Sequence, residues 1–246
     1  MAFNMNRKGT SMRTIALLTA LTAPMLVGCM SRAYQGQALY ALDGGAPGTG
    51  AATVANAQAP TAGGRAHPGV LRIREVTVST PYSNTQFVYR YADGRMRTDP
   101  YASFIGSPEN LINRALVARL SQERLFENVG GSDLSGVTAY ELVVSIRTLG
   151  AVFEADEQVG TAQMSGVAYV LDPTAPAPLV LATFEIGARE ALGADTADAV
   201  AAGLNEALAS WMNRLSEHLR QADLPPLQGS APTAAAAGSS TLAPRK

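Results

Sequence analysis

Few side chains in this chain of 246 residues could carry out chemistry. There is one cysteine, Cys29, and there are two histidines, His67 and His218, neither of them near the cysteine in sequence. A thiol nucleophile needs a base beside it, and a single cysteine can form neither an intramolecular disulfide nor a Cys-x-x-Cys metal site. The Gly-x-x-x-x-Gly-Lys-Ser/Thr phosphate loop, the Gly-x-Ser-x-Gly elbow and His-Glu-x-x-His are absent from the sequence. We therefore predict no catalytic residues, no cofactor and no enzymatic activity.

The closest group of acidic residues is Glu154, Asp156 and Glu157. We interpret it as a solvated turn between two strands, with weak calcium binding as the alternative, because a calcium site needs six or more oxygen ligands. His67 lies in a Gly- and Ala-rich segment and is interpreted as a solvated loop residue. His218 is interpreted as a residue at the boundary of a helix's apolar face. No metal site is predicted.

The N-terminus has the order of a secretory signal peptide, which we place at residues 1–28. Arg7, Lys8 and Arg13 precede an apolar stretch from Ile15 to Val27, and no acidic residue occurs before Asp43. The stretch is shorter than the roughly 20 residues that span a bilayer as a helix. The sequence therefore predicts an exported protein without a permanent transmembrane anchor.

The end of the signal peptide, Leu26-Val27-Gly28-Cys29, resembles the bacterial lipobox. In proteins with this motif, diacylglycerol is attached to the cysteine sulfur before cleavage, so the resemblance implies that Cys29 carries acyl chains such as palmitate. By the sorting pattern that Asp after the cysteine retains a lipoprotein in the inner membrane, Met30 indicates the outer membrane. Acylation at this site would anchor the protein stably.

Composition divides the rest of the chain into three parts. Residues 29–69 combine the lipidated end, a short strand at 39–42 and a flexible linker in which Gly, Ala, Pro and Thr dominate. Residues 70–222 have the hydrophobic pattern of one domain, and 223–246 are predicted to be a disordered tail. The formal net charge of −1 gives no electrostatic case for nucleic-acid binding.

Five strand regions, one of them a hairpin, and two helices are predicted within the domain. In residues 70–78 apolar and polar residues alternate, with a phase slip that indicates a bulge in the strand. Asp93-Gly94 marks a tight hairpin between residues 85 and 99. Three further strand patterns, at 138–149, 162–172 and 178–190, predict an antiparallel meander. In the first of them one face is expected in the core, and the other, which includes Glu141, is expected to be partly wet. Helices are predicted at 107–126, capped by Ser107, and at 196–222, capped by Thr196 or Asp195. The expected fold is α+β, a mainly antiparallel sheet with two long helices packed on one face.

Aromatic residues, scarce elsewhere, gather between 79 and 104 together with several arginines. Alternation places about half of them in the sheet core. Because aromatic and Arg side chains are enriched where proteins meet proteins, the others predict a recognition surface that also draws on Arg95 and Arg97. The candidate partner-binding residues are Phe87, Tyr89, Arg90, Tyr101 and Phe104.

These features together resemble the ABC-type transport auxiliary lipoproteins, the family that includes the lipoprotein of the paraquat-inducible membrane system. The matching features, in order, are "LYAL" at 39–42, "LRIREVTV" at 71–78, "FVYR" at 87–90, an aromatic-then-proline segment, and the helix "NLINRALVARLSQERLFENV". The likeness covers about residues 29–222 apart from the linker. The insertion at 43–68 is unusually long, and Phe104 occupies a region where the family often has Trp.

The resemblance implies a periplasm-facing lipoprotein that works with an ABC permease and ATPase and with a membrane-anchored conduit protein of the mammalian-cell-entry type. Such systems move lipids or other hydrophobic molecules across the cell envelope. The leading hypothesis is a non-catalytic docking component, and homo-oligomerisation stays open. The alternatives are a lipid-binding carrier module, a structural outer-membrane lipoprotein and an envelope-remodelling enzyme.

Overall fold

The computed structural model describes residues 36–45, 67–134, 136–154 and 160–227. Cys29, the lipobox, Asp156 and Glu157 therefore lie outside the described residues, as does the predicted tail beyond residue 227. The described residues from Gln37 onward belong to one compact unit. Its described elements are, in order, β1 (Ala38–Tyr40), β2 (Val70–Val78), η2 (Thr80–Tyr82), β3 (Gln86–Tyr91), β4 (Met96–Phe104), α2 (Pro108–Glu123), β5 (Asn128–Gly130), η3 (Ser132–Leu134), β6 (Ala139–Phe153), β7 (Thr161–Asp172), β8 (Leu179–Ala191) and α3 (Ala197–Gln221).

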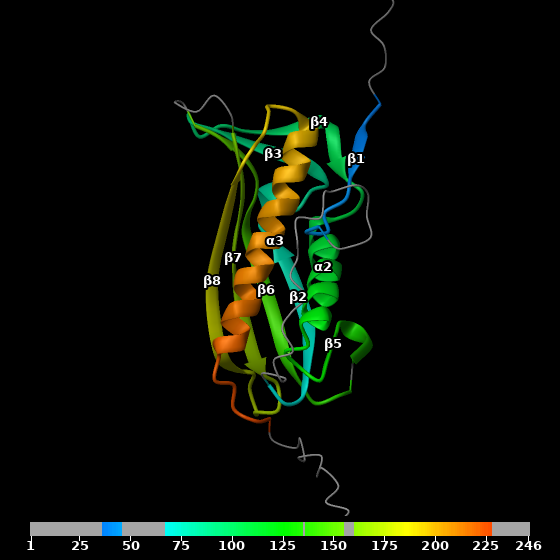
Figure 1. The fold of residues 1–246 in the computed structure, drawn as a ribbon, viewed down its shortest axis with the longest axis vertical. Helices are drawn as coiled ribbons and strands as arrows, with labels where there is room; N and C mark the ends of the chain where they lie inside the picture. Colours follow the sequence, from blue (N-terminus) through cyan, green and yellow to red (C-terminus); the bar gives the residue numbers. More distant parts are fainter. Residues whose placement is uncertain (1–35, 46–66, 135, 155–159, 228–246) are drawn as a thin grey trace, which may run out of the picture. The chain divides into compact units, whose positions relative to one another are not determined.

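The long strand β6 organises a single eight-stranded sheet. On one side it pairs with β7, which pairs with β8. On its other side, the first half of β6 pairs with β2 and its last residues pair with β3. Beyond these strands, β5 flanks β2, and β4 and then β1 flank β3 (Figure 1).

The prediction of a mainly antiparallel sheet is wrong, because the sheet is mixed. The β6–β7–β8 meander and the β3–β4 hairpin are antiparallel as predicted. However, β2–β6, β3–β6, β2–β5 and β1–β4 are parallel pairs. The chain crosses from β2 to β6 by way of α2, and a crossover connection of this kind makes two neighbouring strands parallel.

The phase slip in residues 70–78 corresponds to a β-bulge, as predicted. The register of β2 against β6 shifts between Ile73 and Glu75. The extra residue, Arg74, lets Leu71, Ile73 and Val76 all face the core, where each is buried.

The β3–β4 hairpin also forms where the Asp93-Gly94 pair predicted it. Gly94 has a φ of 80°, in the left-handed region that glycine tolerates best. The loop has three residues, one more than the two of a tight turn. The closing hydrogen bond shows this, since the amide of Tyr91 donates to the carbonyl of Arg95 at 2.9 Å across three intervening residues. Three-residue loops with a left-handed residue before the second strand are the next most common hairpin type.

Both predicted helices form with their predicted caps. The Ser107 hydroxyl accepts from the Asn110 amide at the start of α2, and the Thr196 hydroxyl accepts from the Ala199 amide at the start of α3. The buried stripe of α3 includes Leu204, Leu208 and Trp211, and the Trp211 indole donates to the Ile186 carbonyl of β8 at 3.2 Å.

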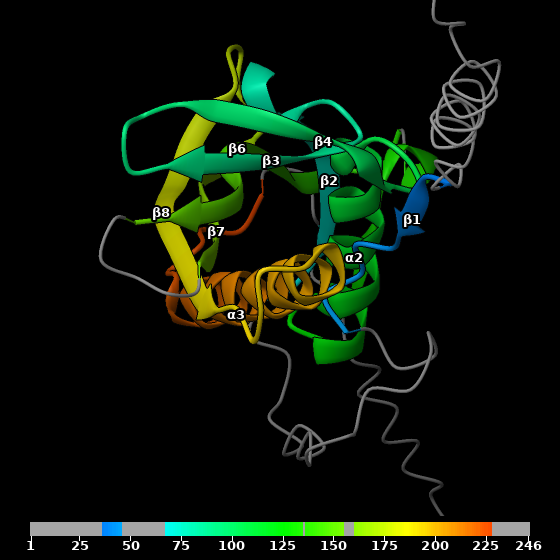
Figure 2. The same cartoon turned by 90° about the horizontal axis from the view of Figure 1, so that it is seen from above.

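The two helices contact different strands of the sheet. Helix α3 contacts β8, β7 and β6, whereas α2 contacts β2 and β5. Figure 2 shows α3 beside β7 and β8, and α2 beside β2. That both helices share one face of the sheet stays a prediction.

The chain is attached to this unit on both sides of the undescribed residues 46–66. On the N-terminal side, the Asn205 side chain on α3 accepts from the amides of Asp43 and Gly44 and donates to the carbonyl of Ala41. On the C-terminal side, the interpretation of His67 as a solvated residue is wrong. Its side chain is 5% exposed, its Nε2 lies 2.6 Å from the Leu219 carbonyl, and its ring packs on Phe126.

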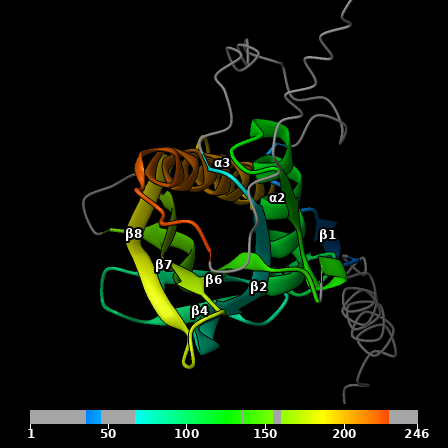
Figure 3. The same cartoon turned by 90° about the horizontal axis from the view of Figure 1, so that it is seen from below.

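The packed region begins before residue 70 and extends past residue 222, the predicted ends of the domain. It starts at Gln37, since β1 pairs with β4. At the other end Leu224 and Leu227 are buried, and the Tyr140 hydroxyl donates to the Pro225 carbonyl at 2.9 Å. Figure 3 shows this segment turning back from α3.

Candidate partner-binding surface

Two of the five predicted partner-binding residues are core residues. Phe87 on β3 is 1% exposed and Phe104 on β4 is 4% exposed, and their ring centroids lie 4.8 Å apart. Tyr40 of β1 extends the cluster, with its ring 5.1 Å from that of Phe87. These rings hold β1, β3 and β4 together, and in this structure they offer almost no surface to a partner.

Tyr89 is half-buried at the boundary between the core and the surface. Its hydroxyl donates to Oδ2 of Asp99 at 2.6 Å, and its ring meets Phe153 of β6 edge to face, with centroids 6.0 Å apart. Burial raises the pKa of the Tyr89 phenol well above its usual value, and the bond to the Asp99 carboxylate raises it further. Tyr89 thus acts as a neutral donor that fastens β3 to β4.

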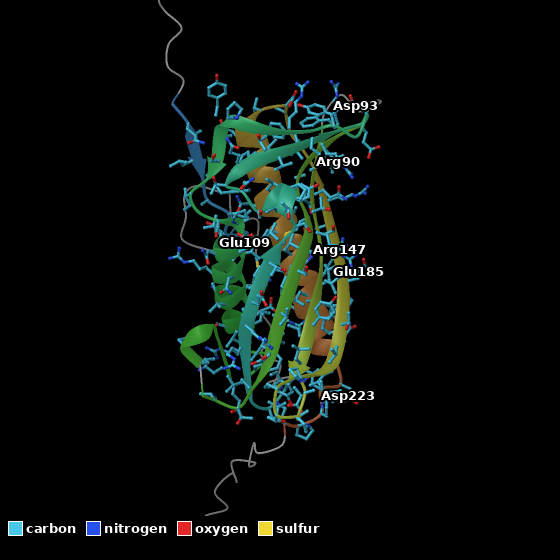
Figure 4. The ribbon with its side chains drawn as sticks, turned by 180° about the vertical axis from the view of Figure 1, so that it is seen from behind. Arg90, Asp93, Glu109, Arg147, Glu185 and Asp223 are labelled. Atoms are coloured by element: carbon cyan, nitrogen blue, oxygen red, sulfur yellow. The ribbon has the colours of Figure 1, made fainter. Side chains whose placement is uncertain are left out.

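Arg90 and Tyr101 are exposed, but they lie in different surroundings. Arg90 is on the face of the sheet turned away from α3, as Figure 4 shows, and its guanidinium lies beside Gln163 of β7. Tyr101 is 54% exposed and lies on the same face of the β1–β4 pair as Leu39 and Ile105. Alternation along the chain places Tyr101, Ser103 and Ile105 on one face. Leu39 of β1 is in register with Ser103 and therefore faces the same way. Leu39 and Ile105 are 63% and 57% exposed, and we call these three residues the β1–β4 apolar patch.

The tip of the β3–β4 hairpin presents a second exposed set, which we call the hairpin surface: Tyr91, Arg95, Met96 and Arg97. The Arg97 guanidinium lies over the Tyr91 ring, 5.6 Å from its centroid, and the same ring stacks on Phe153 at 5.6 Å. Met96 is 40% exposed. The sequence pointed to the two arginines, whereas Phe153 was missed because the predicted strand ended at residue 149.

Short-range contacts fix the shape of the hairpin loop. The Asp93 carboxylate accepts from the Arg95 amide at 3.0 Å and also from Nε of Arg95. These bonds, the backbone bond first, lower the pKa of Asp93 below its usual value. The hairpin surface therefore carries a rigid loop whose acid is ionised and already paired.

The same end of the sheet is connected to α3. The Tyr40 hydroxyl donates to Oδ1 of Asp198 in the first turn of α3, at 2.7 Å. Burial, together with this bond, raises the pKa of Tyr40 to about 12. The contact joins β1 to the helix that lies over β6, β7 and β8.

Glu141 is the buried member of a face of β6 that is partly wet as predicted, since Val143 and Ser145 are half-buried and Arg147 is exposed. It is 4% exposed, and its carboxylate pairs with Arg72 and, at 3.0 Å, with Arg74. Both arginines come from β2, and Arg74 is the bulged residue. This ion cluster joins β2 to β6. Alternation places Arg72 and Arg74 on one face of β2, but it does not reveal that Arg72 is in register with Glu141 of β6.

Within the part of the chain that the structure describes, no group of three His, Cys, Asp or Glu side chains could hold a metal ion. Of the acidic residues Glu154, Asp156 and Glu157, only Glu154 is among the described residues. No helix in the described ranges is both long and apolar enough to cross a membrane.

Comparisons with solved structures agree with the fold. A protein from Xanthomonas campestris assigned to family DUF330 has a similar crystal structure, with a TM-score of 0.57 and 15% identity over 65% of this chain and 89% of the other. A second crystal structure, of an uncharacterized protein, matches with a TM-score of 0.51 and 16% identity over 61% of this chain and 92% of the other. No curated protein sequence matches the chain.

The family comparison covers most of the domain. The model of the ABC-type transport auxiliary lipoprotein component family matches residues 52–216, which include every described strand and helix from β2 up to most of α3. The chain therefore belongs to the ABC-type transport auxiliary lipoprotein component family.

Proposed function

We propose that this protein is a non-catalytic docking component of an ABC-type transport system that moves lipids or other hydrophobic molecules across the cell envelope. In this proposal it is anchored in the outer membrane through acyl chains on Cys29 and faces the periplasm. Its partners are a conduit protein of the mammalian-cell-entry type and, through it, the ABC permease and ATPase. Membership of the auxiliary family supports the association with an ABC transporter.

The observation that carries the docking role is the hairpin surface. It combines an arginine stacked on an aromatic ring with an exposed methionine, a combination enriched at protein interfaces. The aromatic core of Phe87, Tyr89 and Phe104 holds the strands beneath it. A rigid surface of this kind loses little conformational entropy when a partner binds.

The interior of the domain favours docking over lipid carriage. Between α3 and the sheet lie Trp211, Leu208 and Met164, each with an exposed fraction of 0%. A carrier needs an apolar pocket of several hundred Å³ for an acyl chain. The hollow of about 350 Å³ that the described residues form is lined partly by Arg189 and Arg214, whereas Trp211 and Leu208 are fully buried between α3 and the sheet.

Co-purification with the conduit protein tests the proposal. We expect Met96→Ser and Arg97→Glu to lower recovery of the conduit, because both change the hairpin surface without touching the core. Leu179→Ser is the matched control, since Leu179 is also an exposed apolar residue, at 55% against 40% for Met96, but lies at the start of β8. Wild-type protein that never co-purifies with the conduit would refute the docking role.

The anchor is tested separately. Labelling with a fatty-acid analogue is expected to mark the wild-type protein and to leave Cys29→Ala unlabelled and free of the membrane fraction. A Cys29→Ala protein that still sediments with the outer membrane would show that another feature retains it.

A further inference from the structure

Three arginines gather near the free edge of the sheet, outside the hairpin surface and the β1–β4 apolar patch. Arg90 comes from β3, Arg189 from β8 and Arg214 from α3, and Gln163 of β7 lies among them. Figure 4 shows Arg90 on the outer face of the sheet, the same face as Arg147.

These three arginines, like Arg97 of the hairpin surface, have no carboxylate partner among the described residues. Among the described residues, Arg147 pairs with Glu185, Arg95 with Asp93, and Arg220 with Glu123 and Glu217. No acid within the described ranges forms an ion pair with Arg90, Arg189 or Arg214. Within the described ranges, the positive charge of this cluster is therefore not offset by an ion pair.

The one side chain between them cannot satisfy two guanidinium groups. Nη2 of Arg90 lies 3.4 Å from Oε1 of Gln163. With the amide turned over, its oxygen instead accepts from Nε and Nη2 of Arg189, at 3.3 and 3.2 Å. The amide oxygen therefore faces Arg90 in one orientation and Arg189 in the other, and in each orientation the donors of the remaining arginine are left to a further acceptor.

A hollow of about 350 Å³ adjoins this cluster and gives such an acceptor room. Its lining contains no carboxylate and comprises Gln163, Met164, Gly187, Ala188, Arg189 and Arg214. Gly187 keeps it open, because no heavy atom lies within 4 Å of where a Cβ would project. Arg214 reaches the same strand and donates to the Gly187 carbonyl.

We propose that Arg189 and Arg214, with Arg90 and Gln163 beside them, form a binding site for a phosphate group. Arginine presents paired donors that match two phosphate oxygens, and each charge-assisted bond is stronger than one to the neutral amide. The phosphate belongs either to the headgroup of an anionic phospholipid or to a free phosphate ion. The lipid source rests on the proposed transport function, whereas the phosphate site itself does not.

The test uses the full chain purified in neutral maltoside micelles. Three probes are titrated: inorganic phosphate, phosphatidylglycerol added to the micelles, and phosphatidylcholine as the zwitterionic lipid. Calorimetry measures binding, and emission from Trp211, the single tryptophan, reports on the site because its indole is bonded to Ile186 next to Gly187.

The variants are Arg189→Gln and Arg214→Gln, with Arg147→Gln as the matched control. Each site variant is expected to weaken phosphate or phosphatidylglycerol binding by about ten-fold, and the control to leave it unchanged. Phosphatidylglycerol binding that phosphate displaces identifies a lipid headgroup, and binding of phosphate alone identifies a free ion. The proposal is overturned if neither probe binds, if phosphatidylcholine binds equally well, or if Arg147→Gln has the same effect as the site variants.

Failure of this site and failure of docking give different results. The hairpin surface is intact in Arg189→Gln and Arg214→Gln, so both variants are expected to co-purify with the conduit as the wild type does. Their circular dichroism spectra and urea midpoints establish that they are folded.

Discussion

Gly150 of β6 allows β3 to approach, and its replacement by alanine is the sharpest test of how the hairpin is supported. A Cβ at this position would lie 2.4 Å from the Val88 carbonyl oxygen of β3 and 3.3 Å from Cε1 of Tyr82. The closer atom belongs to the backbone, so it cannot rotate away. Gly150→Ala must therefore displace β3 from β6, where Tyr89 is in register with Ala151.

The expected cost follows from the kind of clash. Overpacking a well-filled core typically costs about 1–3 kcal/mol, and we expect the upper part of that range because a strand must move. Gly187→Ala is the matched control: it also lies within a strand, but its Cβ would meet no atom within 4 Å, so its effect should stay within about 0.5 kcal/mol.

Urea unfolding gives the free energy of each variant, and amide hydrogen exchange reports on β3. Gly150→Ala should lower the midpoint and weaken the protection of residues 86–91, and it should also reduce recovery of the conduit. Equal stability of the two alanine variants, with unchanged protection of β3, would refute the close packing of β3 on β6.

Three further perturbations test other contacts. The raised pKa of Tyr89 means that the folded state favours the neutral phenol, so Tyr89 stabilises the fold below about pH 10, and this stabilisation is lost as the pH rises beyond it. When urea midpoints are measured from pH 8 to 11, the midpoint of Tyr89→Phe should decline less steeply than that of the wild type. An identical decline would contradict this. Asn205→Ala removes three hydrogen bonds to residues 41–44 and should lower the free energy of unfolding by about 1–3 kcal/mol. Hydrogen exchange at the amides of residues 43 and 44 should become faster. Unchanged exchange would show that Asn205 does not hold this segment. Glu141→Gln leaves Arg72 and Arg74 without a charged partner and should cost about 1–3 kcal/mol, measured by urea unfolding, whereas Glu185→Gln, in an exposed pair, should cost less than about 1 kcal/mol.

Local features of the fold could be predicted from the sequence because their causes are local. Ser107 followed by Pro108 specifies a helix start, Asp93-Gly94 specifies a hairpin, and the slip between Ile73 and Val76 specifies a bulge. Each depends on backbone preferences or side-chain alternation within a few residues.

Features that depend on distant residues were missed. Alternation does not reveal that β2 lies parallel to β6, since the pairing is decided by the crossover through α2. His67 is surrounded in sequence by small residues and yet is buried against Leu219 of α3 and against Phe126, which follows α2. Likewise, Phe87 and Phe104 are buried in a cluster with Tyr40 of β1, a contact that alternation within β3 and β4 does not show.

The pairing of β1 with β4 has a mechanical consequence for a protein held at Cys29. If that residue is acylated as proposed, only residues 30–36 separate the anchor from the unit that begins at Gln37, a reach of at most about 25 Å at full extension. The long insertion does not add to this reach, because Asn205 and His67 fix its two flanks to the same unit. Lengthening the insertion would leave the distance between domain and membrane unchanged, whereas each residue added between 30 and 36 would increase it.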